Sequence, residues 1–416
     1  METIYQAIHL IEQNNVEKAI RILDQYLPQA SDDEKFTIAD LFLELGLQED
    51  AKNVLEPLRE AYPHETELHL TLAEIYIDLE QDDKALSLLE QIEPSSDHYL
   101  PALLASADLY QTQGLFEVAE QKLIEAKQSA PHEPLIDFAR AELAFSLGEY
   151  QKAVTHYQKV HQTQSSIAEI DISLRLAESL AAIGEFEQSL SFYQKAEKED
   201  EDTLFRYGFI AYQAKRLDIA IKVWEELIER DKEYASVYSY LAHAYDEEGL
   251  VDQGYQTVQD GLKFDPLNKE LLLTGAALAR RSGNNESSYR LAREAVAIDP
   301  GYKEAVLFLV ENYRSDDDFQ AIIDLLSHII DQGEQDGYYK WELAKAYVEE
   351  EQYDLALHAY QEAYDDFKED SDFLKAYGYF LVEEGRKEAA IRIFNCYLAI
   401  EPSDSEIENY LIRLNS

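Results

Sequence analysis

The sequence contains little cysteine and little positive charge. Of its 416 residues, one is cysteine and 36 are lysine or arginine, against 84 aspartate or glutamate, so the formal net charge is −48. A single cysteine, Cys396, excludes an intrachain disulfide framework and suits a reducing compartment. A chain this acidic repels the phosphates of nucleic acids and the anionic surface of membranes. We therefore expect no nucleic-acid partner.

Long apolar runs and a leader segment are also missing. The uncharged stretch "LLLTGAALA" at 271–279 is far shorter than the roughly 20 residues that a membrane span needs. The first residues, "METIYQAIHLIEQ", place no basic region ahead of an apolar run, so no signal peptide is predicted. With 46% hydrophobic and 11% aromatic residues the chain can still bury a core. We expect a folded cytoplasmic protein without direct membrane insertion.

Catalytic and cofactor motifs are absent as well. His64 and His69 have the wrong spacing to share a helix face, and no zinc-protease motif or phosphate-binding glycine loop occurs. Asp316, Asp317 and Asp318 lack the loop pattern of a calcium site. The sequence therefore predicts no catalytic residue, no metal and no cofactor. An undetected hydrolase that uses these three aspartates stays open as an alternative.

What the chain does contain is a repeat of about 34 residues. Two series of small residues, twelve residues apart, run through the whole sequence, and each is small at eleven of twelve places. The first series is Ala7, Ala39, Ala73, Ala107, Ala141, Ala177, Gly208, Ala242, Ala276, Val310, Ala344 and Gly378. The second is Ala19, Ala51, Ala85, Ala119, Ala153, Ser189, Ala220, Gly254, Ser288, Ile322, Ala356 and Ala390. We interpret the chain as about twelve repeats, each with two helices whose backbones approach closely at the small residues.

Each repeat is expected to have one turn between its two helices and another before the next repeat. Between the two helices, glycine favours a left-handed backbone that ends the first helix. It occurs at Gly46, Gly114, Gly148, Gly184, Gly249, Gly283 and Gly385. Proline stands between successive repeats, where a helix must stop. It occurs at Pro63, Pro131, Pro266, Pro300 and Pro402.

This pattern resembles the tetratricopeptide repeat (TPR) family, in particular its bacterial cytoplasmic members. The resemblance also includes an aromatic residue three places after the first small one, as at Phe42, Tyr76 and Tyr110. It implies an all-α fold, a right-handed superhelical solenoid of about twelve helix-turn-helix repeats whose first helices line a concave groove. We predict repeats 1–5 at 1–165, repeat 6 and a hinge at 166–203, repeats 7–12 at 204–404 and a capping helix at 405–416.

The tenth repeat departs from the pattern. It carries Val310 and Ile322 where both small residues are expected. Because larger side chains hold two helices apart, we expect this pair to be splayed.

The predicted groove of the N-terminal half is acidic and apolar. The residue after the first small residue is acidic in five consecutive repeats, and the residue three places before it is apolar in six. We call the first set the acidic ladder: Asp40, Glu74, Asp108, Glu142 and Glu178. We call the second the apolar stripe: Phe36, Leu70, Leu104, Phe138, Leu174 and Phe205. In so acidic a chain the ladder can also be a solvated face.

A second candidate surface lies in the C-terminal half, where arginine and aromatic residues fall on the first helices. It comprises Arg280, Arg314, Tyr338, Trp341, Lys345 and Tyr379. Arginine and aromatic side chains are typical anchors of protein interfaces.

These patterns predict a non-enzymatic scaffold or adaptor. Its partners are expected to be other proteins, which offer extended, basic and amphipathic segments to the ladder and the stripe. The alternative is a regulatory subunit that binds a small peptide and changes conformation at the hinge.

Overall fold

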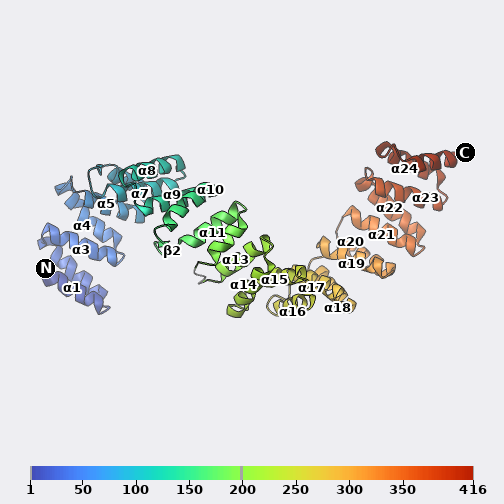
Figure 1. Cartoon of the computed structure of the whole chain (residues 1–416), viewed down its shortest axis with the longest axis horizontal. Coiled ribbons are helices and arrows are strands. Elements are labelled where there is room, and N and C mark those ends of the chain that lie inside the picture. The colour runs from blue at the N-terminus through green and yellow to red at the C-terminus, as the bar shows by residue number, and fades with distance from the viewer. Residues whose placement is uncertain (1, 197–199, 416) are drawn as a thin grey trace. The chain divides into compact units, whose positions relative to one another are not determined.

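The computed structural model describes residues 2–196 and 200–415. The chain divides into two compact units, Met1–Lys198 and Glu199–Ser416. Each unit contains six helix pairs that follow one another in chain order, and helix α25 follows the last pair (Figure 1). The all-α repeat solenoid and the twelve predicted repeats are therefore confirmed.

The first unit contains repeats 1–6. Its helices are α1 (Glu2–Glu12), α2 (Val16–Tyr26), α3 (Asp32–Glu44), α4 (Gln48–Ala61), α5 (Thr66–Asp78), α6 (Asp82–Leu89), α7 (Tyr99–Thr112), α8 (Phe116–Ser129), α9 (Pro134–Ser146), α10 (Tyr150–His161), α11 (Ile172–Ala182) and α12 (Phe186–Tyr193). A 3₁₀ turn, η1 (Leu27–Gln29), follows α2, and the strands β1 (Ser166–Ile167) and β2 (Ile170–Asp171) precede α11.

The second unit contains repeats 7–12 and a final single helix. Its helices are α13 (Glu201–Gln213), α14 (Leu217–Arg230), α15 (Ser236–Glu247), α16 (Val251–Gly261), α17 (Lys269–Arg281), α18 (Asn285–Ile298), α19 (Lys303–Ser315), α20 (Phe319–Asp331), α21 (Gly337–Glu349), α22 (Tyr353–Phe367), α23 (Ser371–Glu383), α24 (Lys387–Ile400) and α25 (Ser405–Asn415). Ile407 and Leu411 of α25 are buried against the last repeat, as a capping helix requires.

The turn inside each repeat has one residue with a left-handed backbone. All seven glycines predicted there have positive φ, for example Gly46 at 73°. The amide of Gly46 donates to the carbonyl of Leu43 at 2.9 Å and that of Leu47 to Phe42 at 2.8 Å, the pairing of a Schellman motif. The remaining five repeats put Asn14, Glu80, Lys215, Asp317 and Glu351 in this conformation, with φ between 56° and 60°. The turn geometry is thus the same in all twelve repeats, with or without glycine.

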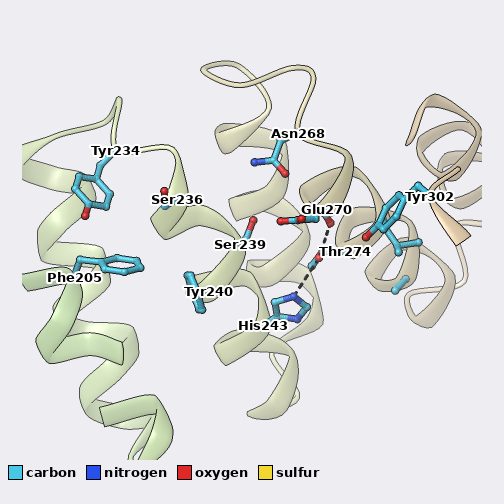
Figure 2. A pocket seen from close by; sticks show the side chains of 12 residues that line it. Phe205, Tyr234, Ser236, Ser239, Tyr240, His243, Asn268, Glu270, Thr274 and Tyr302 are labelled. Carbon is cyan, nitrogen blue, oxygen red and sulfur yellow. Dashed lines mark hydrogen bonds between the residues drawn. The ribbon is translucent and has the colours of Figure 1, made fainter. Parts of the chain in front are cut away.

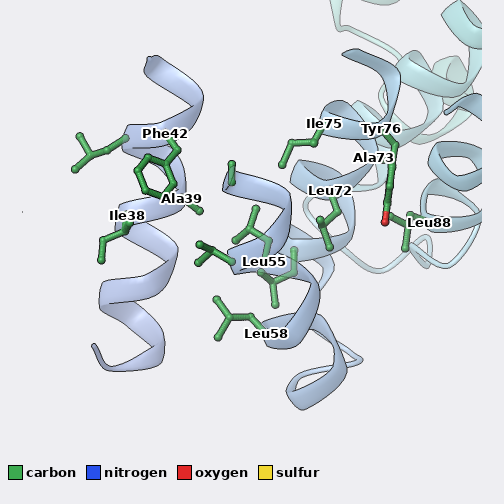
Figure 3. Packing of buried hydrophobic residues seen from close by; sticks show 14 of the residues in the cluster. Ile38, Ala39, Phe42, Leu55, Leu58, Leu72, Ala73, Ile75, Tyr76 and Leu88 are labelled. Carbon is green, nitrogen blue, oxygen red and sulfur yellow. The ribbon is translucent and has the colours of Figure 1, made fainter. Parts of the chain in front are cut away.

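Small residues lie where the two helices of a repeat meet. Every member of both small series is buried. In Figure 3, Leu55 and Leu58 of α4 fill the space between α3, which carries Ala39, and α5, which carries Ala73. Ala39 and Ala73 have no exposed surface, so a larger side chain at either place would have to displace its neighbours.

A short hairpin, which the sequence did not predict, fills the insertion before repeat 6. Strands β1 and β2 are antiparallel, with Ser166 opposite Asp171. The two residues at its tip, Ala168 and Glu169, have φ of 47° and 66°, as a two-residue hairpin turn needs. Movement of the 166–203 segment stays a prediction, and its residues 197–199 lie outside the described part of the chain.

The tenth repeat is more open than the others. The backbones of α19 and α20 come close at fewer places than those of the two helices in each of the other eleven repeats. Val310 and Ile322 are both buried at this interface. The splayed pair expected from these two side chains is therefore confirmed.

Candidate partner-binding surfaces

Three carboxylates of the acidic ladder are exposed and unpaired. Asp40, Glu74 and Asp108 lie at equivalent places on α3, α5 and α7, each directly after a buried small residue. Within residues 2–196 and 200–415, no hydrogen-bond donor or cation contacts their side chains. Repeats 2–4 thus present negative charge that the chain itself does not neutralise.

The pKa values of two of these groups reflect that environment. Partial burial raises the pKa of Asp40, and the charges of Glu67 and Glu44 raise it further. Partial burial also raises the pKa of Glu74, with a further contribution from Asp78. Since Glu67 lies on α5, repulsion between carboxylates reaches from one repeat to the next. A cation placed between these helices would relieve it.

Apolar side chains flank the three carboxylates. Phe36, Leu70 and Leu104 are half-buried, and each packs on the core of its own repeats while one side stays accessible. Near Phe36 the surface is hollowed by about 360 Å³, between α3 and the start of α5. Charge and accessible apolar surface therefore lie side by side in repeats 2–4.

The next two ladder positions are different, because the chain pairs them internally. Arg175 of α11 donates from Nη2 to Oε2 of Glu142 at 3.2 Å and from Nη1 to Oε2 of Glu178 at 3.3 Å. The hydroxyl of Tyr157 also donates to Glu142. A sequence pattern within one helix cannot reveal this pairing, since Glu142 and Arg175 belong to different repeats.

The apolar stripe also changes at this point. Phe138, predicted as a partner-binding residue, is only 8% exposed and packs against the ring of Tyr157 at a centroid distance of 6.3 Å. This corrects the expected exposure of Phe138, because the large Tyr157 ring covers it. Leu174 is half-buried beside the Arg175 pairing. The last stripe residue, Phe205, belongs to the second unit.

In the second unit, Phe205 borders a hollow of about 770 Å³. Figure 2 shows Phe205 and Tyr234 on one side of it and Tyr302 on the other, with Ser239, His243, Glu270 and Thr274 between them. The full lining is Phe205, Tyr234, Ser236, Ser239, Tyr240, His243, Asn268, Glu270, Leu273, Thr274, Ala277 and Tyr302. We call this space the aromatic hollow.

Short side chains create the aromatic hollow. Three places before the small residue, repeats 7 and 9 carry Phe205 and Leu273, but repeat 8 carries Ser239. Directly after the small residue, repeat 9 carries Ala277 where repeat 8 has His243. Sequence reasoning named Phe205 and missed the hollow, although the serine between two large residues was a usable signal.

A buried tryptophan supports the Phe205 wall. Trp224 of α14 has no exposed surface, and its Nε1 donates to the carbonyl oxygen of Phe205 at 3.3 Å. Its ring lies 5.8 Å from that of Tyr240, between centroids. The ring fits because Gly208 lies beneath it: a Cβ at Gly208 would lie 2.2 Å from Nε1. The position of the wall therefore depends on this contact.

The second surface predicted from the sequence is largely occupied by contacts within the chain. Arg280 donates to both oxygens of Asp316, at 2.7 and 3.1 Å, and the hydroxyl of Tyr289 donates to the same carboxylate at 2.7 Å. These bonds hold the pKa of Asp316 at about 2, with the arginine as the largest cause. Arg280 and Asp316 thus link repeats 9 and 10.

Arg314 and Lys345 hold a buried carboxylate. Glu342 of α21 is 1% exposed; Arg314 of α19 donates to its Oε2, and Nζ of Lys345 lies 2.9 Å from its Oε1. Lys345 also lies over the ring of Trp341, with Nζ 3.9 Å from the centroid. This cluster joins repeats 10 and 11.

The aromatic residues of that surface are packed too. Trp341 is 9% exposed, and its ring lies 5.1 Å from Phe367 and 5.4 Å from Phe373, between centroids. The Tyr338 ring lies 6.1 Å from that of Trp341. Tyr379 packs on Tyr410 of α25 at 5.6 Å. These residues therefore pack within repeat 11 or against the element that follows their own repeat, and a binding role for them stays a prediction.

The three consecutive aspartates each have a different structural role. Asp316 holds Arg280, Asp317 is the left-handed turn residue with φ 57°, and Asp318 accepts from the amide of Ala321 at 3.1 Å at the start of α20. Over the described ranges, no three His, Cys, Asp or Glu side chains are grouped as metal ligands would be. In the same ranges no helix has the length and apolar character needed to cross a bilayer.

Paired helices with small residues at their crossings, a left-handed turn in every repeat and a final capping helix define the class of tandem helical repeat proteins. Family models agree with this class: YpiA-like tetratricopeptide repeats match residues 111–165, the YpiA-like C-terminal repeats match 338–404, and a general tetratricopeptide repeat matches 42–97. The chain is 41% identical over 413 residues to the TPR repeat-containing protein YpiA of Bacillus subtilis (strain 168), covering 99% of this chain and 98% of that protein. The chain belongs to the tetratricopeptide repeat family.

The solved structures that resemble the chain are more distant in sequence. YrrB, described as a TPR protein with an unusual peptide-binding site, is 15% identical, with a TM-score of 0.39 over 44% of this chain and 95% of YrrB. A chain of the Naa15/Naa10 complex bound to HypK-THB is 13% identical, with a TM-score of 0.42 over 92% of this chain and 65% of that one.

Proposed function

We propose that the protein is a non-enzymatic scaffold that binds extended segments of other proteins on the first helices of its repeats. The family supports binding as the general role. In repeats 2–4 the geometry favours a basic and amphipathic segment, because lysine or arginine would meet Asp40, Glu74 and Asp108 while apolar side chains would meet Phe36, Leu70 and Leu104.

The observation that carries this proposal is the lack of internal partners for the three carboxylates. Glu142 and Glu178 already share one cation, Arg175, whereas among the described residues no cation pairs with Asp40, Glu74 or Asp108. The proposed contact therefore covers three ladder positions instead of the five that the sequence indicated.

The test compares two variants of equal net charge. The ladder variant is Asp40→Asn/Glu74→Gln/Asp108→Asn. Its matched control, Asp50→Asn/Asp83→Asn/Glu117→Gln, removes three exposed carboxylates from the second helices of the same repeats. Peptides are selected from a displayed random library on the wild-type full chain, and their dissociation constants are measured by fluorescence anisotropy at physiological salt.

We expect the selected peptides to be rich in lysine, arginine and apolar residues. The ladder variant should bind them about 30-fold more weakly, if each lost charge pair contributes about 0.7 kcal/mol, while the control variant stays near wild type. An equal loss in both variants would mean that the peptides respond to bulk charge only. Selection of acidic or uncharged peptides would reject the basic preference.

A further inference from the structure

The aromatic hollow of the second unit offers free hydrogen-bond acceptors. The side-chain oxygens of Ser236, Ser239, Tyr240, Glu270 and Tyr302 have no hydrogen-bond partner within the described residues. Thr274 and His243, by contrast, contact each other at 3.3 Å across the floor. A ligand that donates several hydrogen bonds would therefore find unoccupied oxygens around the space in Figure 2.

The charge around the hollow is negative. Among the described residues that line it are the carboxylate of Glu270 and neither lysine nor arginine. Beside it, Asp202 accepts from the hydroxyl of Tyr234 at 2.8 Å. The neighbouring Lys269 is held by Asp299 and lies over the Tyr302 ring, with Nζ 4.8 Å from its centroid. A cationic ligand would meet a favourable potential here.

The walls add flat aromatic surfaces. The rings of Phe205 and Tyr240 pack edge to face at 5.4 Å, and Phe205 lies 5.5 Å from Tyr234, between centroids. Trp224 supports them from the core side. Such surfaces favour a planar cation that stacks.

We infer that the aromatic hollow is a subsite for an arginine side chain of a partner's extended segment. The guanidinium stacks on the wall formed by Phe205 and Tyr240 and donates to Glu270 and to the free hydroxyls. A lysine has one compact charge and cannot stack in this way, so the subsite discriminates between the two basic residues. The hollow is larger than one side chain, and the neighbouring residues of the segment occupy the rest.

This inference rests on the proposed role in binding partner segments, but it uses the second unit and none of the ladder carboxylates. Two variants test it in the full chain. Glu270→Gln removes the charge and keeps the side-chain shape. Ser239→Phe fills the hollow with the residue that repeat 7 carries at the same place. Asp252→Asn, on α16 of repeat 8, is the control for loss of one exposed charge.

The probes are capped tripeptides that contain arginine, lysine or citrulline between two alanines, and binding is followed by saturation-transfer NMR at physiological salt. We expect the arginine tripeptide to bind the wild type at least about 10-fold more tightly than the other two. Glu270→Gln should weaken it about 10-fold and Ser239→Phe should abolish it, while Asp252→Asn stays at the wild-type value. Circular dichroism checks that each variant is folded.

Equal binding of arginine and lysine, binding unchanged by Glu270→Gln, or no detectable binding of the arginine tripeptide would each overturn the inference. The ladder variant separates the two proposals. If it loses library-selected peptides but keeps the arginine preference, both hold. If the arginine preference alone fails, the scaffold role of repeats 2–4 is unaffected.

Discussion

Repeats 2–4 and repeats 8–12 join their neighbours in different ways. In repeats 2–4 neutral donors reach carboxylates of a neighbouring repeat, as in Gln48 to Asp78 at 2.7 Å and Gln113 to Asp82 at 3.2 Å. In repeats 8–12 cations do so. The pairs are Arg281 with Asp246, Arg280 with Asp316, Lys303 with Asp336 and Arg314 with Glu342.

The comparison shows that a net charge of −48 has different consequences in the two regions. Where a cation pairs with a carboxylate of the neighbouring repeat, the ion pair joins the two repeats. Where a neutral group donates a hydrogen bond to the carboxylate, the negative charge remains and can attract a partner. Four sets of substitutions test this difference between the two regions.

The largest effect is expected at the buried carboxylate of repeat 11. Arg314→Met/Lys345→Met keeps the apolar stems but leaves Glu342, 1% exposed, without a cation. We expect a loss of about 3 kcal/mol in the free energy of unfolding, measured by urea denaturation. Lys52→Met in repeat 2, whose partner Glu49 lies on the same helix, should change stability by less than about 0.5 kcal/mol. Equal losses of stability in the two variants would contradict the proposed difference between repeats 2–4 and repeats 8–12.

The second-largest loss of stability is expected from overpacking at the small residues. Ala73→Leu in repeat 3 should cost about 2 kcal/mol, because the fully buried Ala73 has no space beside it. Val310→Leu in the open tenth repeat should cost less than about 1.5 kcal/mol. Thermal unfolding followed by circular dichroism measures both. A larger cost at Val310 than at Ala73 would contradict the close packing assigned to repeat 3.

A smaller, pH-dependent effect is expected at Asp316. Its pKa is lowered from 3.8 to about 2, so the stabilisation is complete above 3.8 and is lost as pH falls towards about 2. Asp316→Asn should therefore be less stable than wild type at neutral pH, and the two should converge at the acid end. Urea denaturation at a series of pH values measures the difference; a deficit that does not change with pH would reject the ion pair as its cause.

The smallest predicted effect is a gain in the free energy of unfolding instead of a loss. The pKa of Asp40 is raised from 3.8, so its charged form destabilises the fold at neutral pH. Asp40→Asn should be more stable than wild type by less than about 0.5 kcal/mol at pH 7. The gain should disappear as pH falls through the raised pKa to below 3.8. The same denaturation series measures it, and a loss of stability at neutral pH would indicate an internal partner for Asp40.

The repeat architecture could be read from the sequence because its determinants are local. Small residues at a fixed period, and glycine at a turn that needs a left-handed backbone, act within one repeat. The splayed helix pair of the tenth repeat could also be predicted, from the size of Val310 and Ile322. The hairpin at 166–171 was missed, since neither Ala168 nor Glu169 is a typical residue for its turn.

The candidate site was predictable only in part, because charge pairing between repeats is not local. The ladder positions followed from the period, but their chemistry depends on the next repeat: Arg175 pairs with Glu142, and within the described residues no cation pairs with Glu74. In the second unit, Arg280, Arg314 and Lys345 had the composition of an interface, and the structure shows them bound to carboxylates of the chain itself.

The central claim, that the unpaired carboxylates of repeats 2–4 bind a basic segment, is tested most directly by exchanging the charges. One selected peptide and its copy with every lysine and arginine replaced by glutamate are titrated against the wild type and against Asp40→Lys/Glu74→Lys/Asp108→Lys. We predict that the wild type binds the basic peptide and not the acidic one, and that the reversed variant binds the acidic peptide and binds the basic one far more weakly than the wild type does. Failure of the reversed variant to bind the acidic peptide, with its helical circular dichroism intact, would contradict the claim.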